Sequence, residues 1–132
     1  MEQELDKAIG LLGLARKAGK LQTGEETVSA MLAEKRARLT VLASDAGEAV
    51  VRKVRSLAAG TRQRVLTIPC DKLSLGAVLG RPMVSVAAFA DVSFALAFVK
   101  ALPEGTADPA LLQDLEKRVS RVKARRSSKR NP

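Results

Sequence analysis

The sequence contains no histidine, tryptophan or tyrosine, and it has one cysteine and three phenylalanines among 132 residues. Without histidine, the commonest general base and metal ligand is missing, and no serine or cysteine has an imidazole that would activate it as a nucleophile. The lone thiol, Cys70, excludes a disulfide within the chain and a cysteine-rich metal site. We therefore expect no enzyme activity, no metal site and no cofactor.

Long apolar runs are also missing. No uninterrupted apolar stretch is long enough to cross a bilayer, and the start of the sequence lacks a basic segment followed by an apolar one. A single cysteine is typical of a reducing compartment. These features predict a cytoplasmic protein that does not act on a membrane.

Positive charge is what the sequence has in excess, with a formal net charge of +9. Residues 112–132 hold eight Lys/Arg against Asp114 and Glu116, a surplus of six that leaves three for the rest of the chain. Such a balance favours nucleic acid or another polyanion, and a solvated basic face is the alternative. The lack of Trp and Tyr counts against a stacking platform for single strands, which favours a structured RNA.

Apolar residues recur at helical spacing in some segments and form short continuous runs in others. Helices are expected at about 3–18, 23–34, 45–59, 71–79, 91–102 and from 108 onward, with short strands at 20–22, 39–43, 65–68 and 83–88. The 39–43 run, LTVLA, is almost wholly apolar and is expected to be central in the sheet. This alternation predicts the α/β class, a three-layer α/β/α sandwich around a small mixed four-stranded sheet.

Polar residues mark the expected helix starts. Thr23 and Glu26 have the spacing of a capping box, in which the side chain of each residue accepts a hydrogen bond from the backbone N–H of the other. Asp45 and Glu48 repeat this spacing. The remaining expected N-caps are Asp71, Asp91 and Asp108.

Two regions are expected along the chain. Residues 1–102 hold all the strands and form one globular domain, and residues 103–132 form a basic C-terminal helix with a disordered end at 125–132. Leu112, Leu115 and Val119 form the apolar side of this helix and would dock on the domain or on a protein partner. Its Lys and Arg side chains would neutralise phosphates without sequence preference or serve only as a solubilising end.

Three stretches together resemble a known family: LLGLARKAGKLQTGEETV, RLTVLASDA and LSLGAVLGRPMVSVAAFAD. They are similar to the bacterial YlxQ-type branch of the kink-turn-binding ribosomal protein superfamily, which includes ribosomal proteins L-seven-Ae and L-thirty-e. The resemblance covers about residues 5–102. It implies a three-layer α/β/α fold that binds a sharply bent RNA helix with tandem sheared G·A pairs, in a ribosomal or translation-linked role, with ribosomal RNA one candidate.

The resemblance also implies that RNA is read chiefly at the start of the second helix, where the family pattern resembles Gly-x-Asn-Glu with a lysine further along. Thr23 stands for the glycine, Gly24 for the variable residue, Glu25 for the asparagine, Glu26 for the glutamate and Ser29 for the lysine. Only Glu26 matches closely, because ionised Glu25 offers acceptors alone where asparagine offers a donor as well. A carboxylate here would accept from guanine N–H groups or a ribose hydroxyl.

A second implied patch is the loop after the small fourth helix, which shelters an unstacked base in relatives. The predicted RNA-binding residues are Lys17, Lys20, Thr23, Gly24, Glu25, Glu26, Asp45, Gly80, Arg81, Pro82, Met83 and Val84. Structural roles would also explain several of them: helix capping for Glu26 and Asp45, a tight turn for Gly24, and an ordinary helix stop for the loop.

The sequence thus predicts a non-enzymatic RNA-binding protein that recognises a kink-turn or similar internally looped RNA. The alternative is a protein-protein interaction module of the same fold, with only non-specific RNA affinity through its basic tail.

Overall fold

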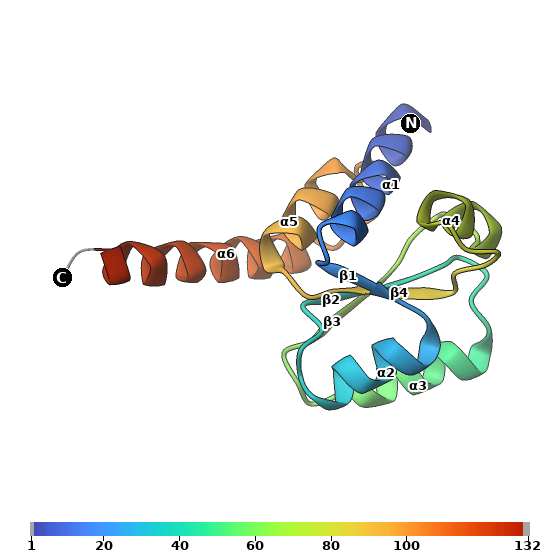
Figure 1. Ribbon diagram of the computed structural model, residues 1–132, viewed down its shortest axis with the longest axis horizontal. Helices are drawn as coiled ribbons and strands as arrows, with labels where there is room; N and C mark the ends of the chain where they lie inside the picture. Colours follow the sequence, from blue (N-terminus) through green and yellow to red (C-terminus); the bar gives the residue numbers. More distant parts are fainter. Residues whose placement is uncertain (1, 131–132) are drawn as a thin grey trace.

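The computed structural model describes residues 2–130, which fold into six α-helices and one four-stranded sheet (Figure 1). In chain order the elements are α1 (Glu2–Lys17), β1 (Leu21–Thr23), α2 (Glu25–Ala33), β2 (Leu39–Leu42), α3 (Glu48–Ala58), β3 (Arg64–Thr67), α4 (Lys72–Leu79), β4 (Val86–Phe89), α5 (Val92–Ala101) and α6 (Pro109–Arg130). Helices and strands alternate up to α5, so the predicted α/β class is confirmed.

The sheet is mixed, with the strand order β1-β4-β2-β3. Strands β2 and β3 run parallel, whereas β4 is antiparallel to both of its neighbours. All four residues of β2 are buried and the strand lies inside the sheet, which confirms the central position predicted for the LTVLA run.

Helices cover both faces of the sheet and make the three predicted layers (Figure 1). On one face, Val28 and Met31 of α2 and Val54 of α3 pack against Leu42 and Val86. The other face carries α1, α4, α5 and the first part of α6, whose buried residues form a second apolar cluster. Successive residues of β4 alternate between these clusters, as the period of a pleated strand requires.

Helix α6 belongs in part to the body of the domain. Leu111, Leu115 and Val119 are buried in the same cluster as α1 and α5, and the rest of the helix projects beyond the body (Figure 1). The boundary expected between 102 and 103 therefore separates residues that pack together. The apolar side of this helix was expected to dock on the domain or on a protein partner, and it packs on the domain.

The C-terminal end differs from the expected disorder, because α6 continues through Arg130. Packing of Leu111 to Val119 fixes the first turns, so later residues extend a helix that is already nucleated. Lys, Arg and Ala, which dominate this stretch, are good helix formers. Residues 131–132 of the predicted disordered segment lie outside the described residues.

Three of the predicted N-caps are confirmed. Asp71 accepts from the Ser74 N–H at 2.7 Å and Asp91 from the Phe94 N–H at 2.9 Å. Asp108 accepts from the N–H of Ala110 at 2.8 Å, just ahead of α6.

Both predicted capping boxes are wrong. Helix α2 has Gly24 as its N-cap and α3 has Gly47, and no described side chain caps either helix. The left-handed φ of 100° at Gly24 turns the chain straight from strand into helix, so Thr23 remains in β1, opposite Ala87. Asp45 accepts instead from the N–H of Lys72, at 2.8 Å.

None of the helices between residues 2 and 130 combines the length and apolarity needed to cross a bilayer.

Candidate nucleic-acid interface

Two of the predicted patches meet at one end of the sheet. The N–H of Gly24 donates to the carbonyl oxygen of Val86 over 3.1 Å, which joins the start of α2 to the start of β4. The loop at 80–85 leads directly into β4, so it lies beside the start of α2. Residues 23–26 and 80–85 together are called the α2 edge below.

The backbone at the start of α2 is not covered by a side chain at Gly24. Gly24 combines φ 100° with ψ 146°, a conformation that side-chain-bearing residues rarely adopt. A Cβ placed on it would meet no atom within 4 Å, so the glycine is required by its conformation and the space above it is open. The first N–H groups of a helix lack partners within it. No described side chain caps those of α2, and the Glu25 and Glu26 side chains beside them are exposed. Donors and acceptors therefore stand side by side.

Close packing on α4 fixes the 80–85 loop. A Cβ added to Gly76 would lie 2.5 Å from the carbonyl oxygen of Arg81 and 2.9 Å from that of Pro82. The N–H of Val84 donates to the Lys72 carbonyl at 3.0 Å, and the Val84 side chain is buried. The loop is therefore a rigid part of the domain.

Apolar side chains stand exposed where this loop meets α4. Met83 is 57% exposed and Leu73, next to the loop-anchoring Lys72, is 66% exposed. The neighbouring Arg81 is also exposed. An apolar surface beside a free cation suits a nucleotide base together with its phosphate.

Asp45 lies at this end of the sheet as predicted. It follows β2, whose last residue, Leu42, pairs with Val86, the first residue of β4. Its carboxylate accepts from the Lys72 N–H at 2.8 Å, so it anchors the start of α4 rather than capping α3.

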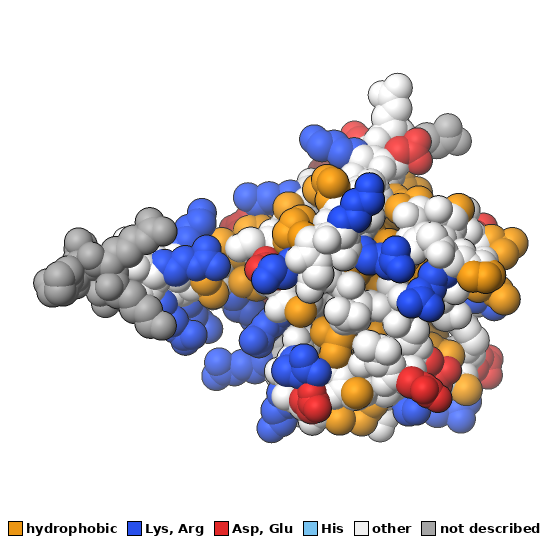
Figure 2. Space-filling view, in the orientation of Figure 1, with side chains coloured by type: hydrophobic (Ala, Val, Ile, Leu, Met, Phe, Trp, Pro, Cys, Tyr) orange, Lys and Arg blue, Asp and Glu red, His pale blue; other side chains and the backbone are white. Residues whose placement is uncertain are grey.

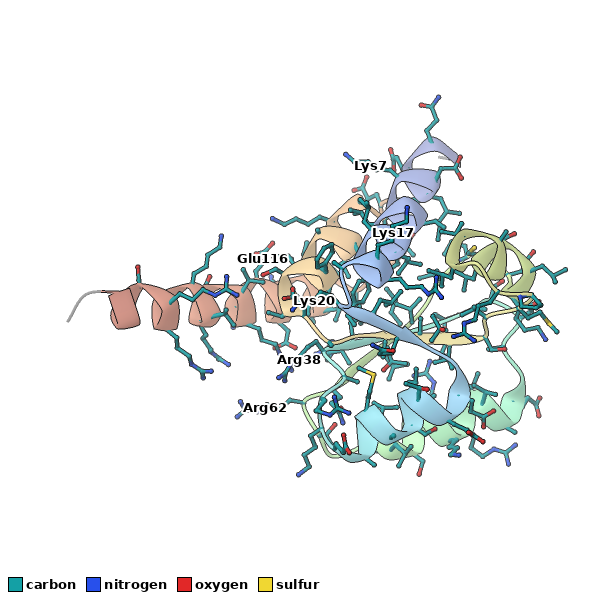
Figure 3. The ribbon with its side chains drawn as sticks, in the orientation of Figure 1. Lys7, Lys17, Lys20, Arg38, Arg62 and Glu116 are labelled. Carbon is teal, nitrogen blue, oxygen red and sulfur yellow. The ribbon has the colours of Figure 1, made fainter. Side chains whose placement is uncertain are left out.

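Lys17 and Lys20 are not brought to the α2 edge. The carbonyl of Lys20 accepts from the N–H of Ala90 at 2.8 Å, beyond the last residue of β4, and Figure 3 shows both lysines at the α1–β1 junction. Arg16 reaches the edge instead, because its Nη1 lies 3.6 Å from the position of a Cβ on Gly80. Arg16 and Lys17 are adjacent in the sequence, and only the packing of α1 on α4 shows which of them faces the loop.

Two ionisable groups near this end have shifted pKa values. Burial raises the pKa of the Cys70 thiol, and the neighbouring Asp71 adds to the effect. The hydrogen bond from the backbone N–H of Ser74 lowers the pKa of Asp71. At neutral pH the thiol is protonated and the carboxylate ionised, so neither group is suited to act as a general acid or base.

Between residues 2 and 130 no three thiol or carboxylate groups converge as metal ligands would.

Comparison with known proteins identifies the family. The model of the Ribosomal protein L7Ae/L30e/S12e/Gadd45 family matches residues 6–98, which include the whole α2 edge. The chain belongs to this family. The RNA-binding protein YlxQ of Enterococcus faecium is 33% identical over 85 residues, covering 61% of this chain and 78% of that protein. The YlxQ-type resemblance predicted from the sequence is therefore confirmed.

Solved structures agree with an L7Ae/L30e-type fold. A protein of unknown function from Bacillus halodurans C superposes with a TM-score of 0.66 at 28% identity, over 72% of this chain and 95% of that one. The 15.5kD RNA binding protein of Giardia lamblia superposes with a TM-score of 0.55 over 92% of this chain and 89% of that one. At 15% identity, the second likeness concerns the fold alone.

Proposed function

We propose that this protein is a cytoplasmic, non-enzymatic RNA-binding protein that recognises a kink-turn or similar internally looped RNA in a ribosomal or translation-linked setting. The observation that carries the proposal is the Gly24–Val86 hydrogen bond, which holds the bare start of α2 beside the apolar 80–85 loop. The name of the YlxQ relative, an RNA-binding protein, and the net charge of +9 support RNA as the partner.

The start of α2 supplies the polar contacts in this proposal. A sheared G·A pair leaves guanine N–H groups and ribose hydroxyls within reach of a protein, and the Glu26 carboxylate accepts from such donors. The free N–H groups of the first turn donate to phosphate or base oxygens. Because Gly24 has no side chain, the RNA approaches the backbone closely.

The 80–85 loop supplies the apolar and cationic contacts. Met83 and Leu73 cover one face of a base turned out of the kinked helix, while Arg81 and Arg16 neutralise the neighbouring phosphates. Recognition of this kind depends on RNA shape, because the two patches are held at a fixed spacing by Gly24 and Gly76.

Glu25 sets the strength of this binding. It stands where the family has an asparagine, and its negative charge repels nearby phosphate without offering a donor. Glu25→Asn is therefore expected to tighten binding of a kink-turn RNA, while Glu25→Gln gives part of that gain through loss of the charge alone.

The proposal is tested by titrating a kink-turn RNA with the full chain and with the Glu26→Gln and Arg81→Gln variants. The matched controls are Glu34→Gln, at the other end of α2, and Arg52→Gln, on the exposed face of α3. Both edge variants are expected to lose affinity while the controls bind as the unchanged protein does. Equal behaviour of edge and control variants would overturn the proposal and favour the protein-interaction module.

A further inference from the structure

A hollow of about 240 Å³ lies where α6 leaves the body of the domain. Five arginines from three segments of the chain surround it, and two valines complete its lining; these residues are Arg38, Arg62, Val92, Arg118, Arg121, Val122 and Arg125. We infer that this arginine hollow is a second RNA-binding site, which holds the phosphate backbone of a helix flanking the element bound at the α2 edge. The inference rests on the proposed function for its choice of RNA.

The arginine hollow is at the opposite end of the sheet from the α2 edge. Arg38 precedes β2, and its N–H donates to the carbonyl of Phe89, the last residue of β4, at 2.8 Å. The α2 edge is bonded to Val86, the first residue of β4. At about 3.4 Å per residue, the two ends of β4 are roughly 10 Å apart. An RNA helix that continues along β4 from the element bound at the α2 edge would therefore reach the hollow.

The hollow is a built feature rather than a chance group of surface charges. The Arg118 guanidinium donates to the carbonyl of Arg62 and pairs with Asp114 at 3.1 Å. Asp114 also faces Arg64 of β3, at 3.8 Å. These contacts lock α6 against the segment before β3, and the Arg118 side chain is left only 17% exposed.

The remaining arginines of the hollow keep their charges free for a ligand. No carboxylate lines the hollow, and no ion pair found among the described residues engages Arg38, Arg62, Arg121 or Arg125. Like charges held this close repel one another, and a bound anion relieves that repulsion. Figure 3 shows Arg38 and Arg62 on the side of the body from which α6 projects.

The spacing of the α6 arginines fits a phosphate backbone better than a single small anion. From Arg118 to Arg125 the helix rises about 10 Å, which matches about three successive phosphates along one strand of a duplex. Guanidinium groups bind phosphate oxygens in pairs of parallel hydrogen bonds. Basic side chains continue along α6 and in the angle between this helix and the body (Figure 2), so the backbone has a path on either side of the hollow.

The test compares two pairs of substitutions on the same helix with the same change of charge. Arg121→Gln with Arg125→Gln removes two arginines of the hollow, and Lys123→Gln with Arg126→Gln removes two exposed cations that do not line it. The probe is a kink-turn RNA with one flanking stem of a full helical turn, titrated with the full chain over a series of salt concentrations. Circular dichroism is the control that checks whether each variant keeps the helix content of the unchanged protein.

The hollow pair is expected to weaken binding by about tenfold or more and to lower the slope of log affinity against log salt by about two. The control pair is expected to do much less. A second comparison tests the part of the hollow that the body of the domain supplies. Its hollow pair is Arg38→Gln with Arg62→Gln, and its control pair is Arg52→Gln with Lys53→Gln. Equal losses from hollow and control pairs, or no loss from either, overturn the inference, and the second result points to an acidic protein as the occupant.

Failure of this inference is distinguishable from failure of the proposed function. Backbone contacts carry no sequence information, so hollow variants are expected to weaken kink-turn RNA and its Watson–Crick-paired control by the same factor. Substitutions at the α2 edge change the ratio of the two affinities instead. If both RNAs bind equally and the hollow pair still weakens both, the proposed function fails while the arginine hollow stands.

Discussion

Gly24 and Val86 are joined by a backbone hydrogen bond of 3.1 Å between residues 62 positions apart in the sequence. This bond places the start of α2 against β4 and so beside the 80–85 loop. Within α4, Gly76 allows the carbonyl groups of Arg81 and Pro82 in that loop to lie directly on the helix. The position of the α2 edge therefore depends on two glycines, one needed for its dihedral angle and the other for its lack of volume.

Gly24→Ala is expected to destabilise the folded chain by about 1–3 kcal/mol, the usual cost of a strained dihedral angle. The cause is the φ of 100°, since a Cβ at this position would meet no atom. The free energy of unfolding in urea measures the effect. Gly10→Ala, on the exposed side of α1 and also without neighbours, is the control and is expected to leave stability unchanged or slightly raised. Equal effects of the two substitutions would contradict the account.

Gly76→Ala is expected to displace the 80–85 loop, because the atoms 2.5 and 2.9 Å from the new Cβ belong to backbone and cannot rotate away. Both stability and affinity for a kink-turn RNA should fall. Gly13→Ala is the matched control, since its Cβ would meet Val78 Cγ1 at an ordinary 3.6 Å. The loop displacement is measured by the amide chemical shifts of Arg81, Met83, Val84 and Ser85, since Pro82 has no N–H. Unchanged shifts in the Gly76 variant would be the contrary result.

Gln63 is a buried polar clamp between α2 and the segment before β3. Its Oε1 accepts from the N–H of Ala37 at 3.0 Å, and its Nε2 donates to the carbonyl of Leu32 at 2.9 Å. Gln63→Ala leaves the buried N–H of Ala37 without this partner, while the Leu32 carbonyl keeps the hydrogen bond from the N–H of Lys35 at 3.1 Å. The expected cost is about 1–3 kcal/mol. Urea unfolding measures this loss, with Gln113→Ala on the exposed side of α6 as the control. A loss no larger than that of the control would refute the clamp.

The charge on Asp71 is expected to make stability depend on pH in the acid range. The hydrogen bond from Ser74 N–H lowers the pKa of this carboxyl below its ordinary 3.8 in the folded chain. Its ionised form therefore stabilises the fold above pH about 3.8, and this contribution is lost as pH falls through the folded pKa. Asp71→Asn keeps a capping oxygen without the charge. The stability difference between it and the unchanged protein should shrink on acidification, whereas a constant difference would speak against the charge.

The apolar patterns were sufficient to predict the fold. Leu39 to Leu42 form a buried central strand as expected, because a run without polar residues is stable only between two covering layers. Asp71 and Asp91 cap their helices as expected, because the interaction is local and spans three residues.

Features that depend on backbone conformation or on packing between distant segments were harder to predict. Thr23 has the right spacing for a capping box, yet a positive φ at Gly24 starts the helix one residue later. Asp45 also has the right spacing for a capping box. Its carboxylate accepts instead from the N–H of Lys72, which is 27 residues away in the sequence. Residues 125–130 are helical because the start of α6 is anchored in the core, so this outcome depends on packing between distant segments.

The candidate sites show the same division. The residues of the α2 edge followed from the family resemblance, and the structure brings 23–26, 45 and 80–84 to one end of the sheet. Lys20 was predicted there because it is near in sequence, but a strand lies between it and Gly24, and Arg16 of the preceding helix approaches the loop instead. The sequence indicated the excess charge of α6. It did not indicate that Arg38 and Arg62 complete a hollow with that helix.

The most direct test of the account is the ratio of the affinities of the full chain for a kink-turn RNA and for the same RNA with its tandem G·A pairs replaced by Watson–Crick pairs. Calorimetric titration at fixed salt measures both, with the chain kept whole because Leu111, Leu115 and Val119 belong to the core. We predict that the kink-turn RNA binds at least about tenfold more tightly, a difference of about 1.4 kcal/mol, and that Glu26→Gln reduces this preference. Equal affinity for the two RNAs would contradict recognition at the α2 edge.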